Sequence, residues 1–569
     1  MLTELAFLWL VMAIAGYGFA FELVWRRCTR AAEHFFSIGD AGLAGLLVLA
    51  AFAIVLHFFI SLSPELGLAL NLVGLIFFIL SARFRLSHYD AINWLFVFLC
   101  LLTFGLQAQL DPPHPDAGIY YIPSILWNSV APIVPGLANL QGRLGYNNAG
   151  LPLATLFRLP LIHWKGAFLL NALFAFFVMA ALFERLRTAL AASGATRIST
   201  LYCLLMIGGF AANHFVFNGS LGSLTTDFAP FFLACYVGFL ILLSLENHDP
   251  ALAGWATLLA TFAVLLKLSA LPLLCGSLLI LLFSRGAFSK WRDTTLAILC
   301  LMFGLFCFWA IRGLLLSGCA VYPTVATCVS KLPWTVPDEL ANNEAQYILD
   351  YARGTIEDPR SVADWLSPIG RGLLSNQIGR FLLLLSGTGL ILLAAVRFRD
   401  KRAIGSNLRA GVVTTCIGLG WLFFAAFKAP AFRFYSGGAF LLAYTIAACG
   451  LFQFRDILAS LHLKRWIPGA LCILLTIQGA VTAIKYFGTR SKDWPHFETP
   501  EVLQRKTDSG LLIWVSGNEY CWDAPLPCTP YFDPALKRIA WLNRFYFVGK
   551  NTIAYYNGFP PRIKNSEPK

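Results

Sequence analysis

Long apolar runs separated by short polar segments are the feature that most constrains this chain, since 58% of its 569 residues are hydrophobic. About 20 helical residues cross the ~30 Å hydrocarbon layer of a bilayer. Backbone N–H and C=O groups must pair internally there, so such runs fold as helices. The sequence therefore predicts an all-α polytopic membrane protein with about fourteen transmembrane helices. The runs cover residues 2–21, 41–59, 68–80, 92–107, 167–183, 200–217, 228–243, 253–266, 270–283, 295–316, 381–396, 412–427, 439–452 and 468–484.

Basic residues predict the orientation of these helices, because short cytoplasmic loops accumulate Lys and Arg. Clusters follow the odd-numbered runs, which places the amino terminus outside. Only the inner loop at 246–249 lacks a cluster. The break around Lys267 is decisive, because one continuous helix over 253–283 would invert every later segment. The clusters are Arg26/Arg27/Arg30, Arg83/Arg85, Arg185/Arg187/Arg197, Arg285/Lys290/Arg292, Arg397/Arg399/Lys401/Arg402/Arg409 and Arg455/Lys464/Arg465.

Three predicted outer segments, 109–165, 318–377 and 485–569, are too long to be simple connections, and long irregular segments usually carry function. We divide the chain into a transmembrane domain, 1–484, and a small periplasmic domain, 485–569. Within the outer segments the sequence predicts three elements: a short amphipathic helix along the membrane surface at 119–127, a helix at 338–353 and a strand at 510–516.

Cysteines test the same orientation, because disulfides persist in oxidising compartments. Most of the fourteen cysteines lie within apolar runs, but two pairs lie in predicted outer segments: Cys319 with Cys328, and Cys521 with Cys528. We interpret them as two short-loop disulfides, with free thiols as the alternative. The expected location is a bacterial inner membrane facing the periplasm. Because basic residues follow the first apolar run instead of preceding it, we expect that run to remain as the first span.

The net charge of +13 does not indicate nucleic-acid binding. The basic residues are scattered over inner loops, where they determine topology and contact anionic lipids, and they form no aromatic-interleaved face. The chain also has no Walker-type phosphate loop, so an energy-coupled ATPase is not supported.

Carboxylates that could act as a general base collect where predicted helices reach the outer face. Asp111, His114 and Asp116 follow the fourth run, and Asp227 precedes the seventh. Each has an alternative interpretation: Asp116 as the cap of a short helix, Asp227 as the cap of the seventh span, and His114 as a solvated loop residue. Asp227 could also orient a sugar or help to bind Mg²⁺ or Mn²⁺, which favour carboxylates.

Three cations lie near the same face: Lys267, Arg312 and Arg433. Charged groups within spans cost about 2.5–3.5 kcal/mol on insertion scales, so they usually snorkel, pair or line a cavity. Snorkelling to lipid headgroups is the alternative for Lys267. Arg312 lies about one turn inside its span, and Arg433 lies in a short aromatic loop where an arginine fork suits a phosphate.

Several stretches in the same order resemble large bacterial membrane proteins from surface-polysaccharide loci. The resemblance covers roughly residues 90–545, and those proteins are similar in layout to GT-C glycosyltransferases. The stretches are Asp116-Ala-Gly-Ile-Tyr-Tyr121, Val134–Asn148, Ser223-Leu-Thr-Thr-Asp227, Lys267-Leu-Ser-Ala-Leu-Pro272, Arg312 with Ser317–Pro323, Arg433-Phe434 and Glu519–Pro530.

The resemblance implies a GT-C-like fold and transfer of a sugar from a polyprenyl-phosphate donor. Asp116 or Asp111 would be the base, while Arg312, Arg433 and Lys267 would bind the donor phosphate. Sugar contacts would come from Asp227, Tyr120, Tyr121, His114, Asn147 and Tyr322. The chain departs from these patterns in two respects: it has His-Pro-Asp at 114–116 where His-Tyr-Asp is usual in the family, and its acidic loop follows the fourth span, whereas the GT-C superfamily often places it after the first. For Asn147 and Asn148 a turn role is equally open.

The expected acceptor is a periplasmic glycan, lipid A or a pilin-like protein. Two rival hypotheses keep the same location. A polymerase or ligase would join diphosphate-linked oligosaccharides, which suits several separated outer arginines. A flippase for lipid-linked sugars would need ionisable groups along a path at mid-membrane depth, and the runs have almost none there.

Overall fold

The computed structural model describes residues 2–29, 36–85, 89–110, 114–193, 197–212, 221–283, 292–353, 367–397, 406–460, 463–489, 494–495, 497–541 and 544–549. Every predicted apolar run overlaps a helix. In this part of the chain, ten helices are long and apolar enough to cross a membrane, so the chain is a multi-pass membrane protein. They are α1 (Leu2–Thr29), α2 (Ile38–His57), α3 (Pro64–Arg85), α4 (Ala91–Ala108), α12 (Phe228–Asn247), α15 (Arg292–Ser317), α18 (Gln377–Arg397), α19 (Ser406–Lys428), α20 (Phe432–Phe452) and α22 (Leu463–Thr489).

The other four runs fall on α9 (Leu170–Ser193), α10 (Ile198–Ala212), α13 (Pro250–Leu266) and α14 (Leu271–Phe283). Three of these helices are apolar but shorter than the ten, and α9 carries charges near its end. Fourteen spans therefore stay a prediction. The predicted break at Lys267 is present, because this residue is extended, with φ −158° and ψ 125°, and a 3-10 turn, η4 (Leu268–Ala270), precedes α14.

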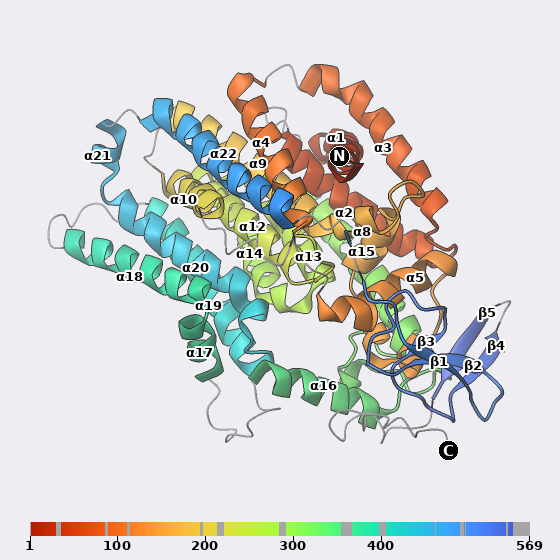
Figure 1. Ribbon diagram of the computed structural model, residues 1–569. Coiled ribbons are helices and arrows are strands. Elements are labelled where there is room, and N and C mark those ends of the chain that lie inside the picture. Colours follow the sequence, from red (N-terminus) through yellow and green to blue (C-terminus); the bar gives the residue numbers. More distant parts are fainter. Residues whose placement is uncertain are drawn as a thin grey trace.

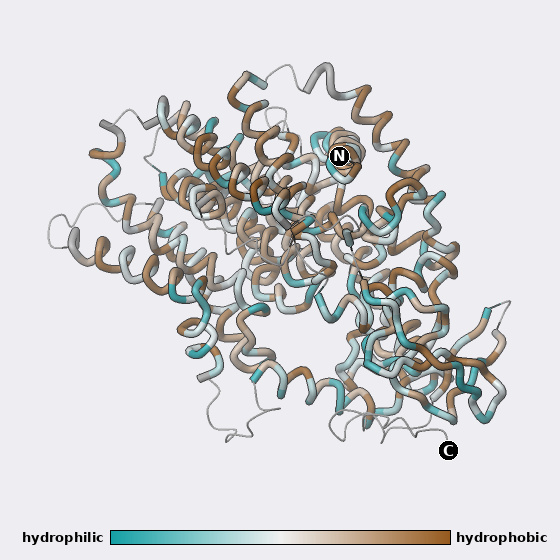
Figure 2. The backbone as a smooth tube through the Cα atoms, in the orientation of Figure 1, coloured by the Kyte–Doolittle hydropathy of each residue, from teal (hydrophilic) through white to brown (hydrophobic). Residues whose placement is uncertain are grey.

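The bundle has a buried centre and a lipid-like periphery. Every residue of α13 is buried, whereas 17% of the apolar windows of α3 and α18 is buried. α12 and α13 lie within the bundle, and α3 and α18 lie at its edges (Figure 1). The outer helices expose large apolar side chains such as Ile79 and Leu384, as expected where lipid replaces water. Hydrophilic residues lie mainly at helix ends and along the strands (Figure 2).

Glycines let the first three helices approach closely. A Cβ on Gly18 of α1 would overlap the carbonyl oxygen of Ala41 in α2, and a Cβ on Gly74 of α3 would overlap that of Ala13. Small residues serve this purpose in membranes, because lipid tails supply no hydrophobic force that drives helices together.

A buried ion pair joins four central helices at the end of the bundle that the basic clusters predict to be cytoplasmic. Arg185 of α9 donates to Asp40 Oδ2 of α2 at 2.9 Å. The Tyr236 hydroxyl of α12 and Trp255 Nε1 of α13 donate to Asp40 Oδ1 at 2.5 and 3.2 Å. Asp40 is fully buried. Such a carboxylate is tolerated in an apolar interior because its oxygens are paired.

Short helices form the outer segments. The predicted helix at 338–353 is confirmed as α16. The predicted helix at 119–127 appears as η2 and α5, and Tyr121, Ile122, Ile125 and Trp127 on it are buried in the protein; its location along the membrane surface stays a prediction. The helices are η2 (Ala117–Tyr121), α5 (Ile122–Val130), α6 (Leu137–Leu140), η3 (Gly142–Gly145), α7 (Gly150–Leu156), α8 (Trp164–Phe168), η5 (Val325–Thr327), α16 (Asp338–Arg353) and α17 (Ser367–Ser375); α21 (Arg455–Ser460) precedes α22.

The described carboxy-terminal residues form five short strands beyond α22, in agreement with the predicted strand at 510–516. β1 (Val502–Lys506) pairs antiparallel with β2 (Leu512–Ser516), with Val502 opposite Ser516, and β2 pairs in parallel with β3 (Cys528–Thr529). β4 (Lys537–Trp541) and β5 (Arg544–Val548) form a separate antiparallel pair. We call residues 497–549 the strand unit.

Both predicted disulfides are present: Cys319 pairs with Cys328, and Cys521 with Cys528. The strand unit covers the first outer segment, since Phe547 N–H donates to Pro135 O at 3.1 Å and Asn139 Nδ2 donates to Phe547 O at 3.1 Å. The strand unit packs on Trp127, whereas Tyr121, Ile122 and Ile125 pack in the core of the helix bundle.

We predict that Asp40→Ala strongly destabilises the protein, because breaking a buried pair by removing one partner costs about 3–5 kcal/mol. Thermal unfolding of the purified protein in detergent micelles measures the effect. Asp456→Ala is the control, since Asp456 is 92% exposed, lies 4.0 Å from Arg455 and should matter little. Equal unfolding temperatures for the two variants would contradict the assigned role of Asp40.

Candidate functional site

Four charged residues from separate parts of the chain meet at the predicted outer end of the bundle. Asp116 immediately precedes η2, Arg143 lies in η3, Lys267 follows α13, and Arg433 is the second residue of α20. The predicted outer ends of these segments therefore lie on one face of the structure, as the alternating topology requires. We call these four residues the charged site.

Asp116 receives one guanidinium at each carboxylate oxygen. Arg143 Nη1 lies 3.7 Å from Oδ1, and Arg433 Nη1 lies 3.8 Å from Oδ2. Direct N–H···O hydrogen bonds measure 2.7–3.2 Å, so these longer pairs are electrostatic contacts. Both carboxylate oxygens can still accept a hydrogen bond from a bound molecule. The side chains of Asp116 and Arg433 are 20% and 33% exposed, which makes both accessible from outside.

His114 is a neutral neighbour of this carboxylate. The backbone N–H of Asp116 donates to His114 Nδ1 at 3.2 Å, so this nitrogen carries the lone pair. Burial lowers the pKa of His114; Asp116 raises it, and Arg433 and Lys267 lower it, with a net decrease. The imidazole is therefore uncharged at neutral pH. His114 orients the Asp116 backbone and adds no positive charge beside Arg143 and Arg433.

Lys267 lies between a carboxylate and an aromatic ring. Its ammonium pairs with Asp227 and lies 4.1 Å from the centroid of Phe434, so it does not snorkel to lipid. Asp227 Oδ2 also accepts a hydrogen bond from Thr225 Oγ1 at 3.1 Å. Burial and Arg433 lower the pKa of Lys267, whereas Asp116 raises it, with a net decrease.

The alternative interpretation of the two aspartates as helix caps does not fit the structure. Asp116 and Asp227 occupy the N-cap positions of η2 and α12, but within the described residues neither side chain accepts a cap hydrogen bond. Their carboxylates point to cations instead. Asp111 lies outside the described residues.

Two of the three predicted sugar-contacting tyrosines are buried. Tyr121 and Tyr322 are 2% and 5% exposed. The ring of Tyr120 packs on Tyr121 with centroids 4.3 Å apart and against Tyr146 at 5.6 Å. Burial raises the pKa of Tyr120, Tyr121 and Tyr146. These rings form the packed floor of the site, and their hydroxyls stay protonated.

Arg312 and Asn147, two residues predicted to contact the substrate, interact with each other. Arg312 Nη1 donates to Asn147 Oδ1 at 2.7 Å, and Asn147 Nδ2 donates to the carbonyl oxygen of Trp309 at 2.5 Å. Trp309 Nε1 in turn donates to Asn147 O at 3.0 Å. Asn148 Nδ2 donates to Leu266 O beside Lys267. These contacts anchor the first outer segment to α15 and α13.

Sequence reasoning missed Arg143 and the aromatic residues of α16. One feature of the sequence could have indicated Arg143: it is a basic residue in a predicted outer segment, whereas Lys and Arg usually collect in cytoplasmic loops. Tyr347 and Tyr351 carried no local signal, since their rings reach Arg143 and Arg433 only through tertiary packing.

The strand unit holds the turn that carries Asp116. In the π-helical turn η2, Ile122 N–H donates to Ala117 O, so the next donor, for Gly118 O, would be Pro123, which has no N–H. Cys521 N–H and Trp522 N–H both donate to Gly118 O at 3.0 Å and replace that donor. The disulfide loop at 521–528 is therefore a cap for η2.

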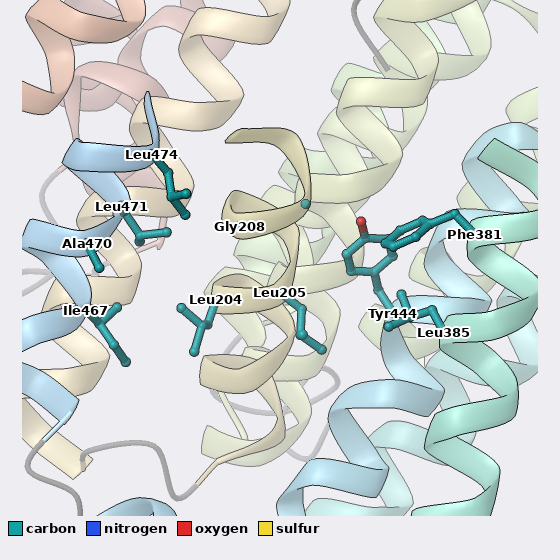
Figure 3. A pocket seen from close by; sticks show the side chains of 11 residues that line it. Leu204, Leu205, Gly208, Phe381, Leu385, Tyr444, Ile467, Ala470, Leu471 and Leu474 are labelled. Carbon is teal, nitrogen blue, oxygen red and sulfur yellow. The ribbon is translucent and has the colours of Figure 1, made fainter. Parts of the chain in front are cut away.

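An apolar cavity of about 380 Å³ lies between α10, α18, α20 and α22. Leu204, Leu205 and Gly208 of α10 lie between Leu471 of α22 on one side and Tyr444 of α20 on the other (Figure 3). Tyr444 is eleven residues beyond Arg433 on α20, which is about 16 Å along a helix. The cavity thus lies three turns from the charged site, at membrane depth.

Among the described residues, no group of three or more His, Cys, Asp or Glu side chains is placed to hold a metal ion. Arg143 and Arg433 supply positive charge at the site, and Lys267 is paired with Asp227.

A family model described as "Domain of unknown function (DUF8201)" matches residues 1–440. This match contains the whole charged site and ends within α20, before the strand unit. A comparison with curated proteins found no match.

We predict that Gly118→Ala loosens the strand unit. A Cβ at this position would lie 2.6–2.9 Å from three ring atoms of Trp522, and overpacking of this kind costs about 1–3 kcal/mol. Limited proteolysis should cleave the strand unit of this variant faster than that of the wild type. Gly517→Ala is the matched control, because nothing lies within 4 Å of its added Cβ. Equal cleavage of the two variants would refute the cap.

Proposed function

Because the chain belongs to the family of the domain of unknown function DUF8201, whose description names no activity, we infer its function from the charged site. We propose that it is a GT-C-like membrane glycosyltransferase that moves a sugar from a polyprenyl-phosphate donor to a periplasmic acceptor. The observation that carries the proposal is the convergence of Asp116 with Arg143 and Arg433 at one end of a membrane bundle.

The arrangement supplies the two groups that such a transfer needs. Asp116 removes the proton of the acceptor hydroxyl, whose oxygen attacks the anomeric carbon. The bond from that carbon to the phosphate oxygen breaks, and the departing polyprenyl phosphate takes the electron pair. Arg433, Arg143 and Lys267 stabilise the charge that develops on this leaving group. A single displacement of this kind inverts the anomeric configuration.

The apolar cavity supports a lipid-linked donor over a soluble one. Arg433 and Tyr444 lie on the same helix, with the cation at its outer end and the cavity about 16 Å deeper. If the donor phosphate bound at Arg433, the isoprenoid chain attached to it would extend along α20 to the depth of this apolar cavity. Substrate of this kind can enter laterally from the lipid phase.

The proposed location is a bacterial inner membrane with the charged site facing the periplasm. Both disulfides lie on the same predicted side as the charged site, and the loop at 521–528 contacts the turn that carries Asp116. An oxidising compartment suits these bonds.

We predict that Asp116→Asn lowers transfer at least 100-fold, since a positioned base contributes about 10²- to 10⁴-fold. Arg433→Ala should lower it about 10²- to 10³-fold through the loss of leaving-group stabilisation. Transfer is measured with purified protein and a panel of synthetic polyprenyl-phosphate sugars and polyprenyl-diphosphate oligosaccharides.

Asp508→Asn is the control, because Asp508 is an exposed residue of the strand unit. Wild-type rates in the Asp116 and Arg433 variants would refute the catalytic assignment. Turnover of diphosphate-linked oligosaccharides alone, with long products, would replace the proposal by the polymerase or ligase alternative.

A further inference from the structure

We propose that α16 forms the acceptor subsite, and that a pyranose ring of the acceptor binds against Tyr351 and Tyr347. This inference rests on the proposed function and names the acceptor as a carbohydrate. In Figure 1, α16 lies between α17 and the strand unit.

One face of α16 contacts the charged site. Glu344, Tyr347 and Tyr351 are spaced i, i+3 and i+7, so they lie on the same side of the helix. Glu344 accepts a hydrogen bond from the Tyr146 hydroxyl, which fixes the helix to the first outer segment. The Cζ atoms of Arg143 and Arg433 lie 5.5 and 4.9 Å from the ring centroids of Tyr347 and Tyr351.

The two rings thus contact the same two guanidinium groups that flank the Asp116 carboxylate. A molecule that contacts Tyr351 lies beside Arg433, which is 3.8 Å from Asp116 Oδ2. Arg433 lies over one face of the Tyr351 ring, so a sugar at the exposed part of this ring would have the guanidinium between it and the proposed base, and the guanidinium N–H groups can donate to its hydroxyls.

Tyr351 is the aromatic residue of this group with open surface. It is 50% exposed, whereas Tyr121 and Tyr322 are buried. Arg433 contacts the rings of Tyr351 and Phe434, with its Cζ atom 4.9 and 4.8 Å from their centroids, and these two cation–π contacts hold its position. The site thus has an aromatic surface at its entrance and a packed aromatic floor.

An exposed tyrosine beside hydrogen-bonding charges matches the chemistry of a pyranose. One face of the sugar carries C–H groups that pack on an aromatic ring, and its rim carries hydroxyls that seek polar partners. An extended peptide acceptor would need backbone hydrogen-bond partners, whereas the backbone groups in the interior of α16 are paired within the helix.

Two measurements test the subsite with the full-length protein in detergent micelles. The first is saturation-transfer NMR with methyl glucopyranoside, methyl galactopyranoside and methyl mannopyranoside in the absence of donor. The second is the acceptor KM in the transfer reaction. The variants are Tyr351→Ala and Tyr351→Phe, and Gln346→Ala is the control because it is exposed on the same helix.

We expect Tyr351→Ala to raise the acceptor KM about tenfold with the donor KM unchanged, and to lose the saturation-transfer signal. Tyr351→Phe and the control should behave as wild type. A Tyr351→Ala defect confined to kcat or to the donor KM would overturn the inference, since Tyr351 would then only support Arg433. Transfer by wild type to a peptide alone, or no pyranoside signal in wild type, would also overturn it.

The outcome separates the two proposals. If wild type shows no transfer but a pyranoside signal that Tyr351→Ala abolishes, the subsite stands and the glycosyltransferase proposal falls. If wild type transfers sugar and Tyr351→Ala has an unchanged acceptor KM, the glycosyltransferase proposal stands and the subsite falls.

Discussion

The cost of placing charge in hydrocarbon organises this protein. Asp40, Asp227 and Lys267 lie at or beside helix ends, and each is paired with an opposite charge. At the predicted cytoplasmic end, Asp40 joins α2, α9, α12 and α13 through Arg185, Tyr236 and Trp255. The same helices α12 and α13 present Asp227 and Lys267 at the other end. The Asp40 cluster thus holds together the helices that place Asp227 and Lys267 at the opposite end of the bundle.

Asp116 itself lies on no spanning helix, so its position depends on contacts made by distant segments. Arg312 donates a hydrogen bond to Asn147, and two backbone N–H groups of the loop at 521–528 donate to the carbonyl oxygen of Gly118. The family match ends at residue 440, before that loop. The part of the chain outside the family match therefore contributes to the geometry of the charged site, although it supplies none of its charges.

Much of the fold could be predicted from local patterns. Apolar length predicted the helices, the polar residue in Leu265–Ala270 marked a break, and the short spacing of each cysteine pair made its partner evident. The positions of Asp116, Arg433 and Lys267 at the predicted outer ends of helices also indicated that they lie on the same side of the membrane. Three features could not be predicted: the partner of Arg312, the role of Arg143 and the aromatic face of α16. Each depends on which outer segment packs on the ends of the helices. The burial of the helix at 119–127 has the same origin.

The central claim is that Asp116 and Arg433 act on the same substrate in one site. A double-mutant cycle measures this directly, through kcat/KM for transfer in Asp116→Asn, Arg433→Ala and the combined variant. The account predicts a coupling of at least tenfold, with the double variant losing much less than the product of the single losses. Losses that multiply would mean that the two residues act independently, and would contradict the account.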